Sequence, residues 1–355
     1  MVNAAAYVAG FGTAFPGGGL DQAQMWDGYF ARHFAGDRLA ERIFRNSGVR
    51  RRHAAIDPLV EDVSAWSTGQ RMQRYVSEAV PLGKEAVGAA LADAGLAADE
   101  LGMFAVVSCT GYATPGLDIR VAADLGMAPE LQRLLVGHMG CYAAIPGLGA
   151  VADHVAARGR PALALCLELT SLHLQPGGVG GEDGRQQVVA HALFGDAAAA
   201  VVVAPGRPAR PGLRVVDVVA RTDPATAGQM TWDVTDLGFR MGLSPEVPRV
   251  LGRHVRGVVD DLLGRNGLTL ADVDAWAVHP GGPRILDTVE ERLDLPDGAL
   301  DASREVLAER GNCSSATVLL VLDALRAAGR PRPGRPAVAM AFGPGLTLYA
   351  ALLHA

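Results

Sequence analysis

Short apolar runs alternate along this chain with segments of helical periodicity. Apolar runs that are bounded by glycines or polar loops are typical of buried strands. We expect such strands at residues 7–12, 104–109, 162–169, 213–219, 275–278, 337–342 and 346–353. Amphipathic or small-residue segments predict helices between them, at 21–33, 37–47, 79–95, 118–125, 143–155, 245–265, 283–293, 301–309 and 314–328. This alternation predicts an α/β protein with mixed sheets covered by helices.

A polar stretch rich in Pro and Gly, residues 204–212, is the clearest boundary in the chain. The segments 193–202 and 341–350 both contain a Phe-Gly pair between apolar runs, and both are interpreted as strand, turn and strand. The echo predicts a duplicated α/β unit with halves at residues 1–205 and 212–355.

Composition narrows the functional classes. The chain has 355 residues, 49% hydrophobic and 20% charged, with a net charge of −6. The negative charge argues against a nucleic-acid partner, and no uncharged apolar run reaches the length of a membrane span. We see no signal peptide at the N-terminus, and the four cysteines lack the pairing typical of metal ligands. We therefore expect a cytoplasmic, soluble, globular α/β protein without a metal site.

Cys141 is the first candidate for chemistry. It follows an apolar approach and a glycine, and it precedes the small-residue helix predicted at 143–155. The positive end of a helix dipole lowers the pKa of a thiol and favours the nucleophilic thiolate. The alternative is a buried cysteine that packs as a small hydrophobic residue.

His279 and Asn312 lie at similar glycine-rich junctions between predicted elements. Taken alone, His279 fits a structural residue at a strand end, and Asn312 fits a turn between helices. Taken with Cys141, they supply a base or ion-pair partner and an oxyanion donor to a nucleophile. Reactive groups of α/β proteins are commonly found at such junctions.

Five segments give the chain a resemblance to a known family. They are Cys109 to Asp118, Gly140-Cys141-Tyr142-Ala143, Leu193-Phe194-Gly195-Asp196, His279-Pro280-Gly281-Gly282-Pro283, and Gly311-Asn312 with Gly343-Pro344-Gly345. In order and spacing they resemble type III polyketide synthases, the chalcone synthase-like group of the thiolase superfamily. Ala341 replaces the glycine that usually begins the last motif. The resemblance implies a thiolase-like five-layer αβαβα fold and a homodimer.

The resemblance also implies a reaction. Cys141 would accept an acyl group from coenzyme A, as a thiolate held by an ion pair with His279. Asn312 and His279 would hydrogen-bond the malonyl thioester carbonyl, so that loss of carbon dioxide gives an enolate that attacks the acyl group. The substrates would be acyl-CoA and malonyl-CoA, with no metal or redox cofactor.

Further pocket residues follow from the same resemblance. Phe194 and Phe239 match the two gatekeeper aromatics between the CoA tunnel and the catalytic cavity, although either could be an ordinary core residue. Thr114 matches the residue that reaches into the neighbouring subunit's cavity. Three more positions would shape the pocket, namely Cys109, Thr170 and His173.

The CoA contacts match less well. Arg42 alone matches the family's basic positions, while two others are Leu39 and Asn46. Arg45, Arg38 or the run at 50–52 could substitute, and a solvated charged face is the alternative.

Residues 232–245 resemble bacterial alkylpyrone and alkylresorcinol synthases more than plant chalcone synthases. We therefore expect an aliphatic acyl-CoA starter, extended by malonyl-CoA and cyclised to a pyrone or resorcinol. Three alternatives remain open at this point. They are a synthase that uses malonyl-CoA alone to make a polyhydroxylated aromatic, an initiating ketoacyl-carrier-protein synthase, and a non-catalytic subunit of a heterodimer.

Overall fold

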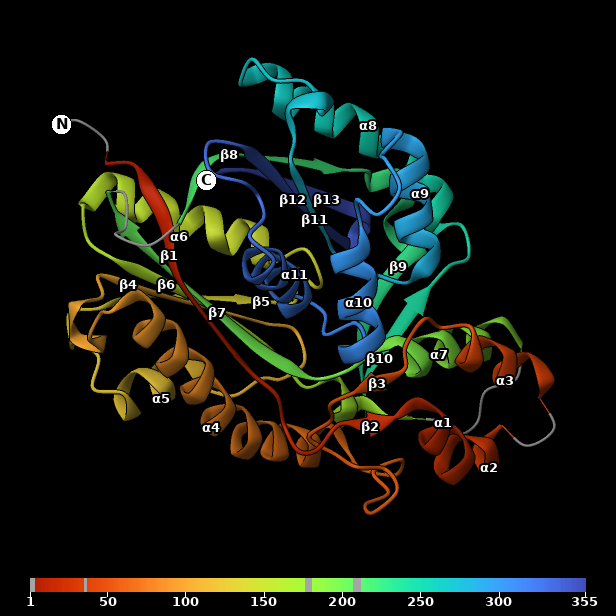
Figure 1. Ribbon diagram of the computed structural model, residues 1–355. Helices are drawn as coiled ribbons and strands as arrows, with labels where there is room; N and C mark the ends of the chain where they lie inside the picture. Colours follow the sequence, from red (N-terminus) through yellow and green to blue (C-terminus); the bar gives the residue numbers. More distant parts are fainter. Residues whose placement is uncertain (1–3, 35–36, 176–180, 207–211) are drawn as a thin grey trace.

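A nine-stranded sheet runs through the molecule (Figure 1). The computed structural model describes residues 4–34, 37–175, 181–206 and 212–355, so most of the boundary stretch 204–212 lies outside the described residues. The first half contributes β1 (Ala6–Ala14), β7 (Ala197–Pro205), β6 (Ala162–Glu168), β4 (Met103–Ser108) and β5 (Gln132–Gly137), in that spatial order. The second half contributes β8 (Leu213–Thr222), β13 (Thr347–His354), β12 (Pro336–Gly343) and β11 (Ala275–Val278).

The two half-sheets have the same pairing pattern. In the first half, β7 pairs antiparallel with both β1 and β6, and β6 pairs parallel with β4. In the second half, β13 pairs antiparallel with both β8 and β12, and β12 pairs parallel with β11. A short β1–β8 contact, Tyr7 with Arg214 and Val8 with Leu213, joins the halves. The expected duplication is therefore confirmed by strand order and direction.

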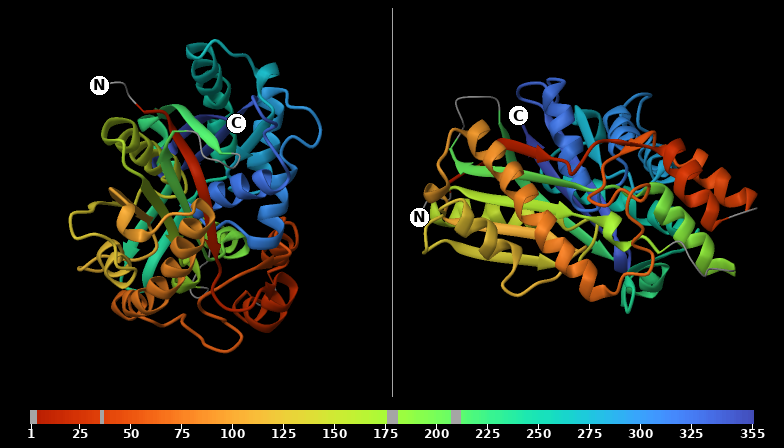
Figure 2. Two further views of the ribbon diagram at one scale, coloured as in Figure 1. Left: turned by 60° about the vertical axis from the view of Figure 1, so that its left-hand side comes forward. Right: turned by 90° about the horizontal axis from the view of Figure 1, so that it is seen from below.

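Helices form three further layers (Figures 1 and 2). α6 (Ala144–Arg158) and α11 (Ala316–Ala327) lie between the half-sheets and contact strands of both. α4 (Thr68–Ala94) and α5 (Leu117–Asp124) cover the outer face of the first half-sheet, while α8 (Val247–Arg265) and α9 (Pro283–Leu293) cover that of the second. The five-layer fold is thus confirmed. No helix in the described part of the chain is long and apolar enough to cross a membrane.

α4 is longer than the helix expected at 79–95. Ser67 begins it with a capping box to Gln70, and Gly95 ends it in the left-handed conformation. Its N-terminal turns bury Arg71. Because a charged residue occupies this buried position, the periodic pattern of apolar residues is interrupted there, and the sequence did not predict these turns. The helix packs so closely on β1 that a Cβ atom at Gly12 would lie 2.1 Å from the carbonyl oxygen of Ala86. Only glycine fits at this crossing.

Several smaller elements surround one end of the sheet. They are α1 (Gln22–Met25), α2 (Ala31–His33), α3 (Arg38–Arg45), α7 (Gly181–Leu193), α10 (Asp301–Arg310), the β2–β3 pair (Leu20–Asp21 with Arg51–Arg52), and a hairpin of β9 (Met230–Thr235) and β10 (Gly238–Leu243). Leu193 ends a helix rather than a strand, so the strand–turn–strand interpretation of 193–202 was wrong in its first part. The second Phe-Gly pair does join two strands, β12 and β13.

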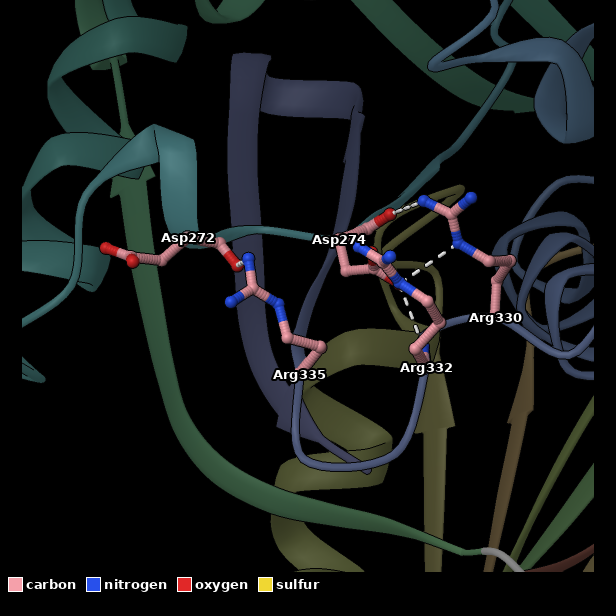
Figure 3. Close-up of polar contacts among 5 residues, drawn as sticks. All are labelled: Asp272, Asp274, Arg330, Arg332 and Arg335. Atoms are coloured by element: carbon pink, nitrogen blue, oxygen red, sulfur yellow. Dashed lines mark hydrogen bonds and ion pairs between the residues drawn. The ribbon is translucent and has the colours of Figure 1, made fainter.

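The buried carboxylate of Asp274 forms hydrogen bonds at the end of the second half-sheet (Figure 3). The Asp274 side chain, just before β11, is 2% exposed. It accepts hydrogen bonds from Nε of Arg330 at 3.0 Å and Nε of Arg332 at 2.9 Å. Arg335 donates to the backbone oxygen of Asp272 at 3.0 Å. These contacts tie the connection between α11 and β12 to the start of the neighbouring strand.

Candidate active site

Cys141 lies at a close approach of two backbone segments. The preceding Gly140 has a φ of 84°, and a Cβ atom there would lie 2.5 Å from Cδ of Pro344. A Cβ atom at Gly343 would lie 3.1 Å from the backbone nitrogen of Cys141. Both glycines are therefore required for the loop after β12 to pack against the nucleophile candidate, which explains why the Gly-Cys and Gly-Pro-Gly motifs occur together.

His279 follows β11 and is buried beside the same loop. Its backbone nitrogen donates to Met340 at 2.8 Å, and its ring meets Phe342 edge-on, with 5.6 Å between centroids. Neither imidazole nitrogen has a hydrogen bond to another described residue, and Nδ1 is fully buried. Phe342 precedes Gly343, which packs on Cys141, so one dipeptide lies against both the imidazole and the cysteine segment.

Asn312 follows α10 and is held at both ends of its backbone. Its nitrogen donates to Leu193 at 2.8 Å and its oxygen accepts from Gly195 at 3.0 Å, which places it beside Phe194. Its side-chain Oδ1 accepts from the backbone nitrogen of Ser314 at 2.9 Å. The Nδ2 donor has no hydrogen-bond partner among the described residues, so it is free to bind a substrate oxygen.

Ser314 connects the asparagine to two thiols. Its hydroxyl lies 3.3 Å from Sγ of Cys109 and hydrogen-bonds Cys141. The sequence analysis does not single out this serine, because its contact with both cysteines depends on the folded backbone. The structure therefore brings the Cys141, His279 and Asn312 segments together, one from the first half and two from the second.

Burial acts on the protonation of both Cys141 and His279. Burial raises the pKa of Cys141 to about 12, although the Ser314 hydrogen bond opposes the shift. Burial lowers the pKa of His279 to about 3. Desolvation disfavours both charged forms more than the helix end favours a thiolate. Burial therefore favours the neutral thiol and the neutral imidazole in the absence of substrate, and the ion pair implied by the resemblance stays a prediction.

Glu168 lies next to this pair and was not singled out from the sequence. Its carboxylate accepts hydrogen bonds from the Cys109 nitrogen at 3.0 Å, the Thr110 hydroxyl at 2.8 Å and the Ser315 hydroxyl. Burial raises its pKa to about 7, while these hydrogen bonds oppose the shift. A charged residue inside the apolar run 162–169 was the available signal, because such residues are almost never buried without partners.

Cys109 belongs to this buried network. Its Sγ lies 3.5 Å from both oxygens of Glu168, and burial, followed by the Glu168 charge, raises its pKa. Among the described residues, no three or more His, Cys, Asp or Glu side chains form a group that could hold a metal ion.

A small cavity of about 30 Å³ lies beside the site. Thr170, His173, Phe194 and Phe239 all line it, and much of the remaining wall is apolar, from Met25, Leu174, Ala190, Trp232 and Met241. The volume suits a water molecule but not an acyl chain. Four residues assigned to the pocket from the sequence thus share one cavity, whereas Cys109 and Thr114 are not among its lining residues.

Phe194 is held in place through its backbone. Arg52, which is 2% exposed, donates to the oxygens of His191 at 2.6 Å and Phe194 at 2.7 Å. The Thr170 hydroxyl donates to the Gly195 oxygen at 3.0 Å and to Asp196 at 2.9 Å. The threonine hydroxyl is therefore occupied in fixing the turn after Phe194.

Three assigned residues lie on the surface. Thr114 is exposed in the loop before α5, where its hydroxyl lies 3.4 Å from the Tyr112 hydroxyl. Arg42 and Arg45 are exposed on the last turn of α3. Arg45 forms a 2.8 Å ion pair with Glu41, whereas Arg42 has no ion pair within the described part of the chain. Of the two arginines, Arg42 is the one with its charge uncompensated.

Comparisons with known proteins identify the family. Two models, for the N-terminal and C-terminal domains of chalcone and stilbene synthases, match residues 2–207 and 215–355. Over 322 residues the chain is 37% identical to a 1,3,6,8-tetrahydroxynaphthalene synthase of Streptomyces peucetius subsp. caesius, covering 89% of this chain and 83% of that protein.

A second relative and a solved structure agree. The alpha-pyrone synthesis polyketide synthase-like Pks18 of Mycobacterium tuberculosis is 32% identical over 338 residues, which cover 88% of this chain and 84% of that protein. The crystal structure of PKS-I from the brown alga Ectocarpus siliculosus superposes with a TM-score of 0.89 at 29% identity, over 99% of this chain and 98% of that one. This chain belongs to the chalcone and stilbene synthase family and is a type III polyketide synthase, an acyl-transferring enzyme.

Proposed function

We propose that this synthase loads an aliphatic acyl-CoA on Cys141, extends it with malonyl-CoA and cyclises the product to an alkylpyrone or alkylresorcinol. The observation that carries the proposal is the set of apolar side chains beside Phe194 and Phe239, among them Met25, Leu174 and Met241, around a space that would have to widen to admit an acyl chain. An alkyl chain gains free energy there by leaving water, whereas a chain made only of malonyl units carries a carbonyl on every second carbon. Coenzyme A substrates fit a cytoplasmic location.

The loading step starts from a neutral Cys141 thiol and a neutral His279 imidazole. As the Cys141 sulfur attacks the acyl-CoA carbonyl, its proton passes to His279, so the thiolate forms only together with the new carbon–sulfur bond. The tetrahedral intermediate then expels the coenzyme A sulfur, which takes the proton back. A thiol with a raised pKa is thereby protected from reaction until a substrate excludes water and aligns the imidazole.

The extension step uses Asn312. Its free Nδ2 and the His279 ring would hydrogen-bond the thioester oxygen of malonyl-CoA. These donors stabilise the negative charge that develops on this oxygen as the carboxylate leaves as carbon dioxide. The enolate carbon then attacks the Cys141 acyl carbonyl, forming the new carbon–carbon bond and releasing the Cys141 thiolate. That thiolate accepts the lengthened chain for the next round.

A second candidate uses malonyl-CoA as both starter and extender. It is favoured by the 37% identity to a protein named 1,3,6,8-tetrahydroxynaphthalene synthase, which exceeds the 32% identity to the alpha-pyrone relative. The two candidates share the Cys141, His279 and Asn312 chemistry and differ only in the starter.

The starter is tested with purified enzyme and malonyl-CoA, alone and with each acyl-CoA from hexanoyl to palmitoyl. Products are identified by liquid chromatography and mass spectrometry, with the Cys141→Ala variant as control. We expect products whose mass includes the added acyl chain. A product from malonyl-CoA alone, unaffected by any acyl-CoA, would instead establish the second candidate.

We also propose a homodimer formed through the β5 face. β5 is the edge strand of the large sheet, yet it exposes Leu134 and Leu135, at 36% and 48%. Tyr112 and Thr114 are exposed in the loop that leads to Gly116, where a Cβ atom would lie 3.5 Å from Cδ2 of Leu135. Uncovered apolar edge strands are uncommon in monomers. Sedimentation equilibrium should give twice the chain mass for wild type and a smaller mass for Leu135→Glu.

A further inference from the structure

The β9–β10 hairpin has an unpaired edge that faces other residues of the first half. Among the described residues, β10 pairs antiparallel only with β9, in a two-stranded sheet. In an antiparallel pair, the backbone groups of every second residue point away from the partner strand. Phe239, Met241 and Leu243 are these outward-facing residues of β10, and in a wider sheet a third strand would bind their N–H and C=O groups.

Side chains bind these groups instead. His173 Nδ1 accepts from the Phe239 nitrogen at 2.9 Å, and Gln175 donates to the Phe239 oxygen at 3.1 Å. Gln187 donates to the Met241 oxygen at 2.6 Å, and Gln186 accepts from the Leu243 nitrogen at 2.7 Å. We name His173, Gln175, Gln186 and Gln187 the polar ladder.

His173 is the most constrained member of the polar ladder. Its Nε2 lies 2.7 Å from the Thr110 oxygen, which only accepts, so Nε2 carries the proton and Nδ1 is the acceptor for Phe239. The imidazole also stacks on the Phe239 ring, with 4.4 Å between centroids and 11° between planes. Trp232 of β9 donates to the Cys109 oxygen at 2.7 Å. His173 and Trp232 therefore join the hairpin to the segment that follows β4.

Both hydrogen bonds of the Phe239 backbone outside the hairpin go to the polar ladder. Side chains therefore set the position of the Phe239 ring in the cavity wall. Substituting these side chains changes that position without altering any backbone pairing. His173, Gln187, Trp232, Phe239 and Met241 also line the cavity directly. Both the polar ladder and the hairpin thus contribute to the same wall.

We propose that the polar ladder is the specificity device of this synthase: by holding β10, His173 and the three glutamines position Phe239 and so set how far the space beside Phe194 and Phe239 opens for an acyl chain. This inference rests on the proposed function, because it assigns those residues to the selection of an acyl starter. They are positioning residues, since they act through Phe239. Loss of a ladder bond lets β10 move outward, which enlarges the cavity and favours longer chains.

The test compares three variants of the full-length enzyme. His173→Leu removes both imidazole bonds, Gln187→Leu removes the bond to Met241 with little change of shape, and His173→Asn keeps an acceptor that can reach the Phe239 nitrogen. Gln24→Leu, at an exposed glutamine of α1, is the matched control. For each protein, kcat/KM is measured with hexanoyl-, decanoyl- and palmitoyl-CoA in the presence of malonyl-CoA.

We expect the palmitoyl-to-hexanoyl ratio of kcat/KM to rise about fivefold in His173→Leu and Gln187→Leu, the effect of one typical hydrogen bond. It should stay near wild type in His173→Asn and Gln24→Leu. Selective ¹⁵N-phenylalanine labelling, with nine phenylalanines in the chain, gives a readout without substrate. The Phe239 amide should exchange with solvent faster in His173→Leu than in His173→Asn.

The outcomes separate this inference from the proposed function. Wild-type enzyme that uses no added acyl-CoA would overturn both. An active His173→Leu enzyme with an unchanged chain-length ratio would overturn only the polar ladder as a specificity device. An equal loss of kcat/KM for all three substrates would also overturn it, because it would show a purely structural role.

Discussion

The backbone N–H of Ser314 donates a 2.9 Å hydrogen bond to Oδ1 of Asn312. Ser314 has a φ of 47°, in the left-handed region that non-glycine residues seldom adopt, and this conformation turns its N–H toward the side chain two residues earlier. The amide of Asn312 is thereby fixed in one orientation, in which Nδ2 has no hydrogen-bond partner among the described residues. Because Oδ1 is already bonded to Ser314, only the Nδ2–H group is left for a ligand, and an N–H donor is suited to stabilise an oxyanion.

Asn312→Ala should therefore impair decarboxylation and not loading. We expect release of carbon dioxide from malonyl-CoA to fall about 100-fold, the usual effect of removing one oxyanion donor. Acylation of Cys141 in a single turnover should change little. Asn312→Asp is the matched control, since it keeps the Ser314 bond but lacks the donor, and it should behave like Asn312→Ala. Equal losses in both steps would contradict this role.

The reactivity of Cys141 should rise with pH without a plateau near neutrality. Because burial raises the pKa of this thiol to about 12, only a small fraction is thiolate at neutral pH in the absence of substrate. Alkylation by iodoacetamide, followed by peptide mass spectrometry at Cys141, should accelerate about tenfold per pH unit above pH 7. A plateau below pH 8 would show that the ion pair with His279 exists in the free enzyme.

Glu168 should make the protein less stable as pH rises. Its pKa is raised from 4.5 to about 7, so between these values the folded protein binds the proton that the unfolded chain releases. The free energy of unfolding therefore falls across this window, by about 3 kcal/mol for this group. Urea unfolding should show that wild type loses more stability than Glu168→Gln between about pH 5 and pH 8. Parallel profiles would refute the shift.

Asp274→Asn should destabilise the second half. The substitution removes the charge that Arg330 and Arg332 share and leaves them imperfectly bonded (Figure 3). We expect a loss of about 2 kcal/mol in the free energy of unfolding, within the range for a buried hydrogen-bonding group that loses its partner. Asp260→Asn, at an exposed pair with Arg256, is the control and should cost less than about 0.5 kcal/mol. A similar cost in both variants would show that burial of Asp274 adds nothing.

The sequence predicted the fold well where burial is complete on both faces of a strand. The buried strands β4, β6, β11 and β12 appear as continuous apolar runs because both of their faces pack on helices. The β9–β10 hairpin was missed, since β9 is largely half-buried or exposed and its pattern is weak. The division at residues 205–212 stays a prediction, because most of that stretch lies outside the described residues.

For the candidate site, motifs indicated which residue types occur, and the fold determined how they are protonated and bonded. Cys141, His279 and Asn312 could be chosen from glycine-rich junctions, but the raised pKa of Cys141 depends on burial that a sequence does not encode locally. Glu168 and the three glutamines of the polar ladder were missed, and His173 was named only as a pocket residue. The ladder binds backbone groups of β10, and such partners carry no sequence signal.

The most direct test of the central claim is the intact mass of the enzyme after mixing with acyl-CoAs, without malonyl-CoA. Wild type and Cys109→Ala should each gain one acyl group per chain, while Cys141→Ala should gain none. The Cys109 variant controls for the second thiol beside the Ser314 hydroxyl. An acyl adduct on Cys141→Ala would contradict the assignment of Cys141 as the nucleophile.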